Sequence, residues 1–250
     1  MEQPFDGRTV VVTGGSRGLG RAMAAGFAAA GADVVIASRR LESCEDAAAE
    51  IAAVTGRRIV PMACHVGRWD EVTAFVERVR EEVGDVDVLV NNAGMAPLFS
   101  SLTDLSEELF DKTIAVNLKG PFRLSALVGE QMVARGRGVI LNVSSVAAIR
   151  PKPTDLIYAA AKAGLDTLTA GFARALGPKV RVNTIMAGPF LTDIAKHWDM
   201  EVVGARIAGY PLQRAGEPDE IVGAALHLAS DAASFTTGAV LRVDGGMGVT

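Results

Sequence analysis

A tyrosine and a lysine one helical turn apart are the residues of this sequence best suited to proton transfer. Tyr158 and Lys162 stand at i and i+4, so in a helix their side chains project from the same face. Tyrosine has an ordinary pKa of about 10, and a lysine cation held about 4–6 Å away can lower it by roughly 1–3 units. Ser145, thirteen residues before Tyr158, supplies a hydroxyl to hold a reacting oxygen. The set predicts a catalytic site, although a Tyr-x3-Lys spacing also occurs by chance on solvated helices.

A glycine-rich turn follows the first apolar run of the chain. Residues Thr13 to Gly20 (TGGSRGLG) come directly after Thr9–Val12 and open a helical pattern. Glycines at such a turn let backbone N–H groups approach a pyrophosphate at a helix N-terminus. A tight strand-to-helix turn without a ligand is the alternative, but the position in a first strand–helix unit favours dinucleotide binding. The residues expected to line this site are Gly14, Ser16, Arg17, Gly18, Leu19 and Gly20.

The end of the second apolar run bears on which dinucleotide would bind. An NAD site places an acidic residue about 20 residues beyond the glycines, where it accepts a hydrogen bond from the ribose 2′-hydroxyl. This chain instead has Ser38-Arg39-Arg40 at eighteen to twenty residues past Gly20. Arg39 offers planar donors to a 2′-phosphate and Arg17 could add a second cation, unless these arginines are only solvated surface charge. The pattern favours NADP(H), with NAD(H) as the alternative.

Short β-branched runs alternate with longer segments whose apolar residues recur every three or four positions. Near-continuous apolar strands separated by helices are typical of a parallel sheet covered on both faces. We therefore expect one doubly wound α/β domain over residues 1–250 with a seven-stranded parallel sheet. Residues 188–216 contain no predicted strand and are expected to be an insertion that covers a substrate pocket. The predicted strands are Thr9–Val12, Val34–Ile36, Arg58–Val60, Val86–Val90, Val139–Val143, Val180–Asn183 and Ala239–Val243.

Composition and charge argue against several classes of protein. Hydrophobic residues make up 49% and charged residues 22% of the chain, as in ordinary globular proteins, and the formal net charge of −4 gives no general attraction to nucleic acid or anionic lipid. The first residues lack the pattern of a secretory signal, and the weakly polar stretch 22–37 is too rich in alanine for a membrane span. Cys44 and Cys64 form neither a disulfide framework nor a metal-ligand cluster. We expect a reduced, cytoplasmic enzyme without a catalytic metal.

Several further motifs stand in order along the chain from Gly7 to Gly246. Together with the glycine turn and the serine–tyrosine–lysine set, they make the sequence resemble the short-chain dehydrogenase/reductase family. Among its subfamilies, the 3-oxoacyl-[acyl-carrier-protein] reductases and the related sugar or polyol dehydrogenases are the most similar. The further motifs are Asn91-Asn92-Ala93-Gly94, Asn117, Arg181-Val182-Asn183 and Asp244-Gly245-Gly246.

The resemblance implies a Rossmann-type fold and a set of catalytic roles. Tyr158 would exchange a proton with the substrate oxygen, and Ser145 would hydrogen-bond that oxygen as negative charge develops on it. Lys162 would lower the pKa of the phenol and hold the nicotinamide ribose. Asn117 would support a water chain that links Lys162 to solvent, although an asparagine there could also only cap a helix turn.

Further cofactor-binding residues are implied by the same resemblance. His65 stands where many relatives have an aspartate that contacts the adenine amino group, and Ala187 stands where many have proline. Asn91 and Gly94 lie at the end of a predicted strand. There they could form a turn, line the cofactor site, or do both. The full expected set beyond the glycine turn is Ser38, Arg39, Arg40, His65, Val66, Asn91, Ala93, Gly94, Tyr158, Lys162, Gly188 and Thr192.

The expected substrate wall is largely apolar, which favours an apolar or mid-sized carbonyl compound over a highly hydroxylated sugar. Core packing or an oligomer contact is the alternative role for many of these side chains. The residues expected to bind substrate are Met95, Ser145, Ile149, Tyr158, Phe190 and Trp198.

The function expected from these observations is hydride transfer between NADP(H) and a carbonyl or secondary alcohol, as in 3-oxoacyl reductases. The alternatives are an NAD-linked polyol or sugar-acid dehydrogenase and, from another class, a nucleotide-sensing binding protein without catalysis. The family resemblance further implies a homotetramer in which helices around 107–130 and 155–176 form one dimer contact, with Phe172 as an anchor.

Overall fold

The computed structural model describes residues 3–193, 204 and 207–249. Seven parallel strands form a single sheet in the order β3-β2-β1-β4-β5-β6-β7, which confirms the predicted seven-stranded parallel α/β fold. Each strand overlaps a predicted one, and the differences lie at the ends. The strands are β1 Thr9–Thr13, β2 Asp33–Ser38, β3 Ile59–Ala63, β4 Val88–Asn91, β5 Gly138–Ser145, β6 Val180–Ala187 and β7 Val240–Val243.

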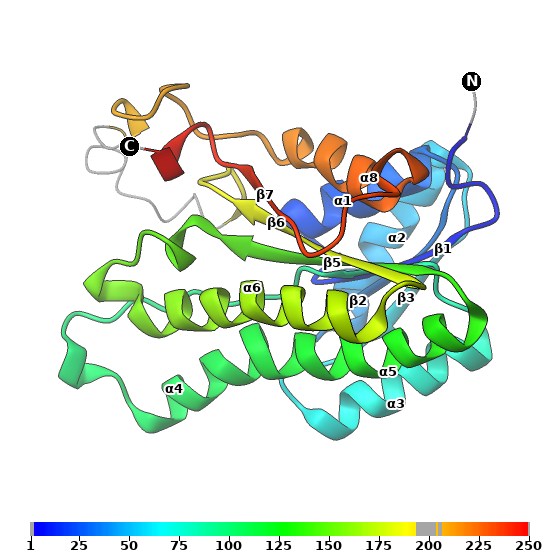
Figure 1. Cartoon of the computed structure of the whole chain (residues 1–250), viewed down its shortest axis with the longest axis horizontal. Helices are drawn as coiled ribbons and strands as arrows, with labels where there is room; N and C mark the ends of the chain where they lie inside the picture. Colours follow the sequence, from blue (N-terminus) through cyan, green and yellow to red (C-terminus); the bar gives the residue numbers. More distant parts are fainter. Residues whose placement is uncertain (1–2, 194–203, 205–206, 250) are drawn as a thin grey trace.

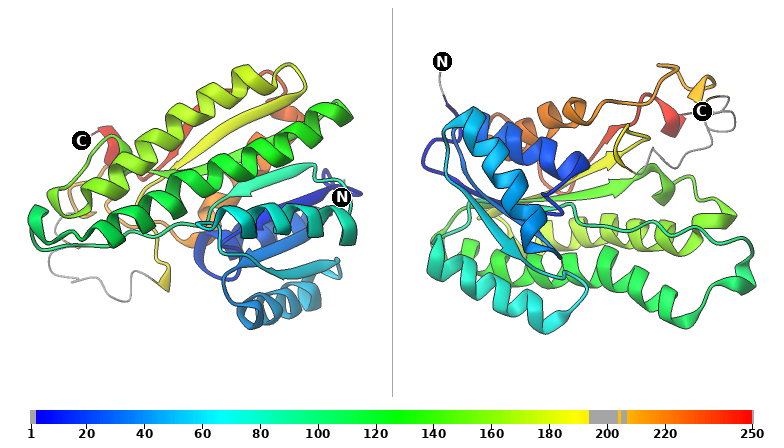
Figure 2. Two further views of the ribbon diagram at one scale, coloured as in Figure 1. Left: turned by 90° about the horizontal axis from the view of Figure 1, so that it is seen from below. Right: turned by 180° about the vertical axis from the view of Figure 1, so that it is seen from behind.

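Helices cover both faces of the sheet (Figure 1). On one face lie α1 (Gly18–Ala29), α2 (Leu41–Thr55) and α8 (Val222–Ala229). On the other, α3, α5 and α6 lie side by side, as the view from below in Figure 2 shows, and α4 continues into α5 through a π-helical turn. The bounds on this second face are α3 Trp69–Glu82, α4 Glu107–Ile114, the π turn Ala115–Lys119, α5 Gly120–Arg135 and α6 Leu156–Leu176.

The two-sided cover explains why the strands read as continuous apolar runs. In β1, Val10 and Val12 belong to the same core cluster as Phe27 of α1, whereas Val11 between them belongs to the cluster that contains Phe75 of α3. All three valines are almost completely buried because successive side chains of a strand point to opposite faces and each face has its own core.

Strand β3 forms one edge of the sheet and contains Pro61. The N–H of Cys64 donates to Ser38 O at 2.8 Å, and Arg58 O accepts from Val34, so the even-numbered residues of this strand face β2. Pro61 therefore directs its nitrogen, which carries no hydrogen, toward the open side of the strand. A proline is tolerated at this position because no neighbouring strand needs its missing donor.

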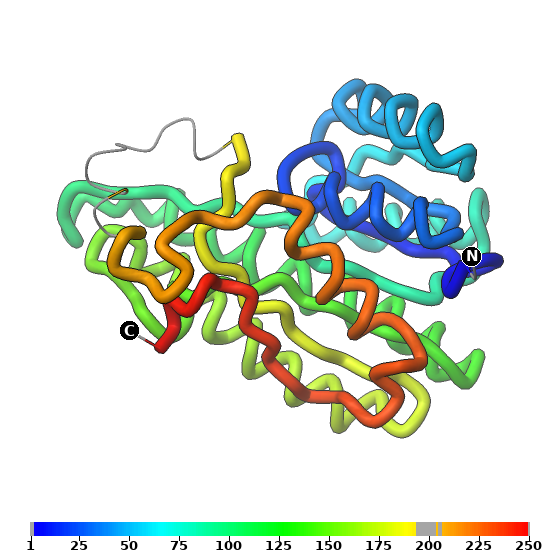
Figure 3. Tube along the Cα trace, turned by 90° about the horizontal axis from the view of Figure 1, so that it is seen from above, coloured from blue at the N-terminus to red at the C-terminus, as the bar shows by residue number. Residues whose placement is uncertain are grey.

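The carboxyl ends of the parallel strands lie along the same edge of the sheet, and the segment after β6 leaves from that edge (Figure 3). In the described part of the expected insertion 188–216, Phe190 forms an isolated parallel bridge with Gly216. Residues 194–203 and 205–206 lie outside the described residues. Among the helices that are described, none is long and apolar enough to cross a membrane.

Candidate active site

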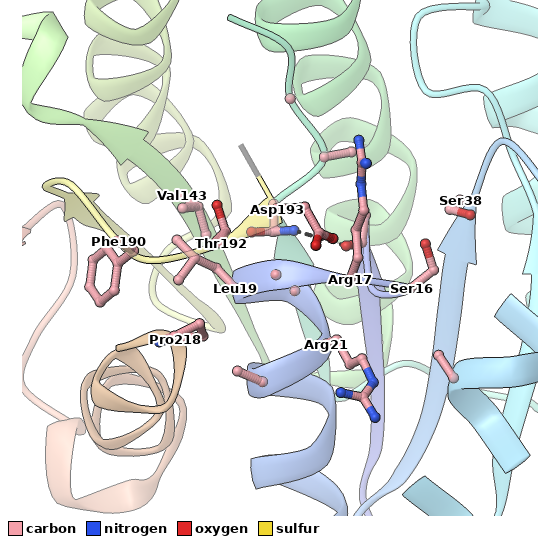
Figure 4. A pocket seen from close by; sticks show the side chains of 18 of the residues that line it. Ser16, Arg17, Leu19, Arg21, Ser38, Val143, Phe190, Thr192, Asp193 and Pro218 are labelled. Carbon is pink, nitrogen blue, oxygen red and sulfur yellow. Dashed lines mark hydrogen bonds between the residues drawn. The ribbon is translucent and has the colours of Figure 1, made fainter. Parts of the chain in front are cut away.

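A large cleft of about 2420 Å³ runs along the carboxyl ends of the strands. Its walls come from the glycine turn, the ends of β2 to β6, helix α6 and the segment that follows β6. Figure 4 shows the part of this wall around the glycine turn, with Ser38 at the end of β2 and Phe190 and Thr192 after β6. The side chains of Ser145, Tyr158 and Lys162 line the same cleft as Gly14 and Gly18. The proton-transfer residues and the glycine turn, which are more than a hundred residues apart in the sequence, thus belong to one site.

The glycine turn has the backbone that the sequence predicts. Gly14 and Gly18 have φ values of +65° and +54°, which side-chain-bearing residues rarely adopt. A Cβ at Gly20 would collide with Gly14 O and with Asn92 Nδ2, so this glycine is required by close packing. Helix α1 begins here with no side-chain cap and no acidic residue in its first turn. Its N-terminal N–H groups therefore remain available to an anion.

Asn92, and not the expected Asn91, faces the cleft. Asn92 Nδ2 donates to Thr13 O at 2.9 Å and to Gly14 O at 3.3 Å, which ties the end of β4 to the glycine turn. Asn91 points the other way, because successive strand residues alternate. It is buried and donates to Ser125 Oγ and Asn142 Oδ1, both at 2.9 Å. The prediction of Asn91 as a cofactor-lining residue is therefore wrong, and its role is to join β4, β5 and α5.

Exposed cations stand where the second strand ends. Arg39 and Arg40 are exposed at the cleft wall, Ser38 is half-buried beside them, and Arg17 projects from the glycine turn. Ser38 Oγ donates to Arg40 O at 3.2 Å. All four residues line the cleft as expected.

The end of β3 forms the neighbouring wall, with His65 and Val66 lining the cleft. His65 Nδ1 accepts from the N–H of Gly67 at 3.2 Å, and the His65 N–H donates to Glu71 Oε2 at 3.0 Å. The ring is therefore oriented by the local backbone. Cys64 also lines this wall, but burial raises the pKa of its thiol to about 12, so it is not a nucleophile.

Lys162 is a buried cation at the base of the cleft. Its side chain is only 4% exposed, and Nζ donates to Val143 O at 2.8 Å. The same atom lies 5.8 Å from the centroid of the Tyr158 ring. Burial lowers the pKa of Lys162 to about 8, against an ordinary value of 10.5, while Asp166 acts in the opposite direction.

Tyr158 departs from one expectation. Burial raises the pKa of its phenol; a hydrogen bond with Ser145 opposes this, and Asp155 adds to it. The expectation that Lys162 lowers this pKa is wrong for the structure as it stands, because the ammonium is directed at Val143 O and the phenol is desolvated. A phenol that keeps its proton near neutral pH is suited to donate it to a carbonyl oxygen.

Ser145 ends β5 beside Tyr158. Its Oγ accepts from the N–H of Ala147 at 3.2 Å, which caps the short 3-10 turn Val146–Ala148 and fixes the side chain. The hydroxyl hydrogen is not used in that contact and can be donated to another oxygen.

Asn117 lies in the π-helical turn and is completely buried. Its Nδ2 donates to Met95 O at 2.8 Å and Thr113 O at 2.9 Å, and its Oδ1 accepts from Met95 N at 3.2 Å. The side chain thus holds the backbone after β4 in place and does not itself line the cleft. A Cβ at Gly94 would lie 2.9 Å from Asn117 Oδ1 and 3.6 Å from Lys162 Nζ, so all three groups meet at one point.

The segment after β6 closes the cleft from the other side. Thr192 rests on the glycine turn, since a Cβ at Gly18 would lie 3.3 Å from Thr192 Cγ2. Gly188 and Phe190 also line the cleft, and Phe190 packs closely against Gly216. These placements agree with the predicted positions of Gly188, Phe190 and Thr192 at the site.

The remaining substrate residues have mixed outcomes. Met95 lines the cleft as expected. Ile149 is 47% exposed and does not line it, because it follows the 3-10 turn after β5 and points to solvent. Trp198 lies outside the described residues.

The residues of this cleft fit a bound dinucleotide. The uncapped helix N-terminus would hold a pyrophosphate, the arginines after β2 would face the adenosine ribose, and Lys162 and Tyr158 would lie at the nicotinamide end. A nicotinamide in that place would supply the hydride chemistry. Among the described residues, no cluster of His, Cys, Asp and Glu could hold a metal ion.

Comparison with known proteins identifies the family. A family model described as enoyl-(acyl carrier protein) reductase matches residues 14–248. The 3-oxoacyl-[acyl-carrier-protein] reductase FabG of Chlamydia trachomatis is 39% identical over 241 residues, covering 96% of this chain and 97% of the relative. The chain belongs to the short-chain dehydrogenase/reductase family. As a member of this family it is an oxidoreductase of carbonyl or alcohol groups that uses a nicotinamide cofactor.

Other short-chain dehydrogenase/reductase relatives differ in substrate. The L-rhamnose 1-dehydrogenase (NAD(P)(+)) of Azotobacter vinelandii is 39% identical over 247 residues, covering 96% of each chain. A solved structure from Beutenbergia cavernae, assigned as an NAD(P)-dependent gluconate 5-dehydrogenase and containing NADP at low occupancy, has a TM-score of 0.94 and 33% identity over the full length of both chains. Relatives of comparable identity thus include an acyl-carrier-protein reductase and dehydrogenases of a sugar and a sugar acid.

Asn92 and Pro218 are among the cleft residues that the sequence reasoning missed. Asn92 was passed over in favour of its neighbour, although the side of the strand that meets the turn could have been inferred from the alternation of β4. Pro218 begins the turn that leads into α8 and lines the cleft opposite the glycine turn. Pro218 was difficult to predict as a cleft residue, because nothing in the sequence near 217–222 indicates contact with the first helix.

Proposed function

We propose that this protein is an NADP(H)-dependent reductase of a carbonyl compound to a secondary alcohol, of the 3-oxoacyl reductase type, and that it also catalyses the reverse oxidation. The observation that carries the proposal is a single cleft with an uncapped helix N-terminus and exposed arginines at one end and Ser145, Tyr158 and Lys162 at the other. A binding protein without catalysis would not need a desolvated phenol and ammonium in that position.

The proton step follows from the protonation of these residues. Because burial keeps the Tyr158 phenol protonated, its hydroxyl donates to the substrate oxygen as the carbonyl is reduced. Ser145 donates a hydrogen bond to the same oxygen and so stabilises the developing negative charge. Lys162, charged below a pH of about 8, would hold the ribose of the cofactor beside these two hydroxyls.

The preference for NADP(H) is supported by the charges at the end of β2. Arg39, Arg40 and Arg17 provide donors at the place where a ribose 2′-phosphate would lie, and Ser38 occupies the end of the strand itself. A carboxylate there would accept from a 2′-hydroxyl and would repel a phosphate, whereas guanidinium groups bind phosphate in a bidentate manner.

Kinetics with both cofactors test this proposal. The wild-type protein is expected to reduce a short 3-oxoacyl ester with NADPH at a kcat/KM at least about tenfold above that with NADH, the value of one charge-assisted contact. The Arg39→Ala variant should lose about that factor for NADPH and little for NADH. Arg80→Ala, which removes an exposed arginine on α3, is the matched control and should change kcat/KM with neither NADPH nor NADH. A wild-type preference for NADH would reject the cofactor assignment.

An NAD-linked polyol or sugar-acid dehydrogenase is the second candidate, favoured by the likeness to the rhamnose and gluconate enzymes. The described cleft wall argues for a less polar substrate, since Met95, Phe190 and Leu191 line it. Faster turnover of a sugar lactone or polyol than of a 3-oxoacyl ester would establish this candidate instead.

We also propose a cytoplasmic homotetramer, following the family resemblance. Helices α4 to α6 present an exposed Phe110 and Phe122 on the face expected to form one dimer contact. Phe172, expected as an anchor, packs against Phe122 with ring centroids 5.5 Å apart and is partly buried within the chain. Phe122 and Phe110 are therefore the better candidates for that contact. A monomeric mass in solution would reject the assembly.

A further inference from the structure

Lys162 is a buried ammonium whose charge needs compensation. A cation that is 4% exposed is strongly penalised by burial, and buried charges in proteins are generally paired. The acceptor of its hydrogen bond, Val143 O, is neutral. The groups around it from other elements are the Val143 carbonyl of β5 and the Asn117 amide of the π turn, near Gly94; neither carries a charge.

Asp166 stands one helical turn beyond Lys162 on the same face of α6. Its Oδ1 is buried without a hydrogen-bond partner, which is unusual for a carboxylate oxygen. Burial raises the pKa of this carboxyl, and the groups that face it act in the opposite direction: the hydroxyls of Ser144 on β5 and Thr184 on β6, and the ammonium of Lys162 on its own helix. The carboxylate therefore lies between α6 and the two strands behind the catalytic residues.

Asp166 adjoins a chain of buried polar side chains. Thr184 Oγ1 and Thr169 Oγ1 are 2.7 Å apart, and Thr169 Oγ1 accepts from Asn142 Nδ2 at 2.8 Å. Ser144 Oγ donates to the backbone O of Lys162 at 3.4 Å. These residues are nearly inaccessible to water, whereas Asp166 itself is half-buried with Oδ1 on the inaccessible side. The field of the carboxylate therefore reaches further on the protein side than in solvent.

We propose that Asp166 is a positioning residue that acts through Lys162: its carboxylate is the counter-charge that keeps the buried ammonium in its charged form. The direction of the effect agrees with the opposing influence that Asp166 has on the pKa of Lys162. Asp166 does not line the cleft. The functional consequence rests on the role of Lys162 in the proposed reductase, whereas the electrostatic pairing does not.

The primary test is a titration of Lys162 that needs no turnover. In protein labelled with ¹³C at lysine Cε, the resonance of Lys162 is identified by its absence from Lys162→Arg. Its wild-type titration midpoint is expected at about 8. In Asp166→Asn the midpoint should fall by about one pH unit or more, the effect of losing one nearby opposite charge. An unchanged midpoint in a folded Asp166→Asn protein overturns the proposal.

Two controls separate charge from packing. Asp70→Asn makes the same substitution at an exposed position in the first turn of α3 and should leave the midpoint where it is. Thr184→Val removes a hydroxyl beside Asp166 without removing charge, so it should move the midpoint much less than Asp166→Asn does. A fall of equal size in Thr184→Val would assign the effect to packing and reject the counter-charge. If Asp166→Asn does not fold, Asp166→Ser provides the same comparison.

The pH dependence of turnover is the second readout. The alkaline limb of kcat/KM should move to lower pH by the same amount as the Lys162 midpoint, giving a loss of about tenfold above pH 8, while the two enzymes converge near pH 6. A purely structural defect would lower activity equally at all pH values. If the Lys162 midpoint shifts in Asp166→Asn but the wild type shows no turnover, the proposed function is refuted and the pairing stands. If the wild type turns over but the midpoint does not shift, the pairing is refuted and the proposed function stands.

Discussion

The two ends of the cleft are built in different ways. At the nucleotide end, the glycine turn is shaped by the backbone: positive φ values at Gly14 and Gly18, close packing at Gly20 and a clasp from Asn92. At the catalytic end, function depends on side chains whose protonation is set by burial. We therefore expect the nucleotide end to be sensitive to any added atom but not to pH. We expect the catalytic end to tolerate small changes of side-chain shape but not changes of charge.

The largest effect is expected at the catalytic end. Replacing Tyr158 by Phe removes the proton donor but almost no volume, so kcat for carbonyl reduction should fall by about 10²–10⁴-fold. Binding of reduced cofactor, measured by fluorescence titration, should be nearly unchanged because the glycine turn is untouched. If Tyr158→Phe turns over as fast as wild type, the proton donor is another group. The catalytic end would then not depend on the Tyr158 side chain.

The matching change at the nucleotide end is Gly20→Ala. The added Cβ would collide with Gly14 O and Asn92 Nδ2, so the turn must shift; we expect a loss of cofactor binding and about 1–3 kcal/mol of unfolding free energy. Urea unfolding and cofactor titration measure the two effects. Gly223→Ala in α8, where a Cβ meets nothing within 4 Å, is the control and should not destabilise. Equal stability of both variants would show that the turn is not constrained as described.

A smaller effect follows from the pKa of Lys162. Because burial lowers that pKa to about 8 from 10.5, the folded protein releases this proton before the unfolded chain does as pH rises. Between these values the unfolded chain binds more protons, so this group makes the unfolding free energy increase with pH, by up to about 3 kcal/mol.

The difference between wild type and Lys162→Met isolates this contribution. Unfolding by urea from pH 7 to 10 should show wild type gaining stability relative to the variant over that window. Lys179→Met, an exposed lysine with the same substitution, should follow wild type. If the unfolding free energies of wild type and Lys162→Met change in parallel with pH, burial does not destabilise the charged form of Lys162.

The sequence was sufficient for those features that depend on pattern. Seven apolar runs predicted seven strands, and glycine spacing predicted the turn, because burial on both faces and positive φ leave direct traces in residue type. The sequence was insufficient for features that depend on the direction in which a side chain points. The i, i+4 spacing placed Lys162 beside Tyr158 but could not show that Nζ points to Val143 O, and the predicted direction of the Tyr158 pKa was therefore wrong.

Register and exposure account for the other differences. A one-residue step along β4 exchanges Asn91 for Asn92 at the cleft, and a short 3-10 turn after β5 turns Ile149 to solvent. Asp166 was overlooked although its spacing from Lys162 is as regular as that of Tyr158. Only the packing of α6 on two strands reveals that one oxygen of its carboxylate is buried.

Pro61 has a consequence for self-association. An incoming strand pairs with a sheet edge by accepting from its outward N–H groups, and β3 lacks one of them near its middle. Sheet extension and amyloid-like stacking are thereby discouraged on this side of the protein. At the opposite edge, β7 contains no proline and leaves Val240 and Leu241 partly exposed, so the main-chain groups of that edge are not blocked in the same way.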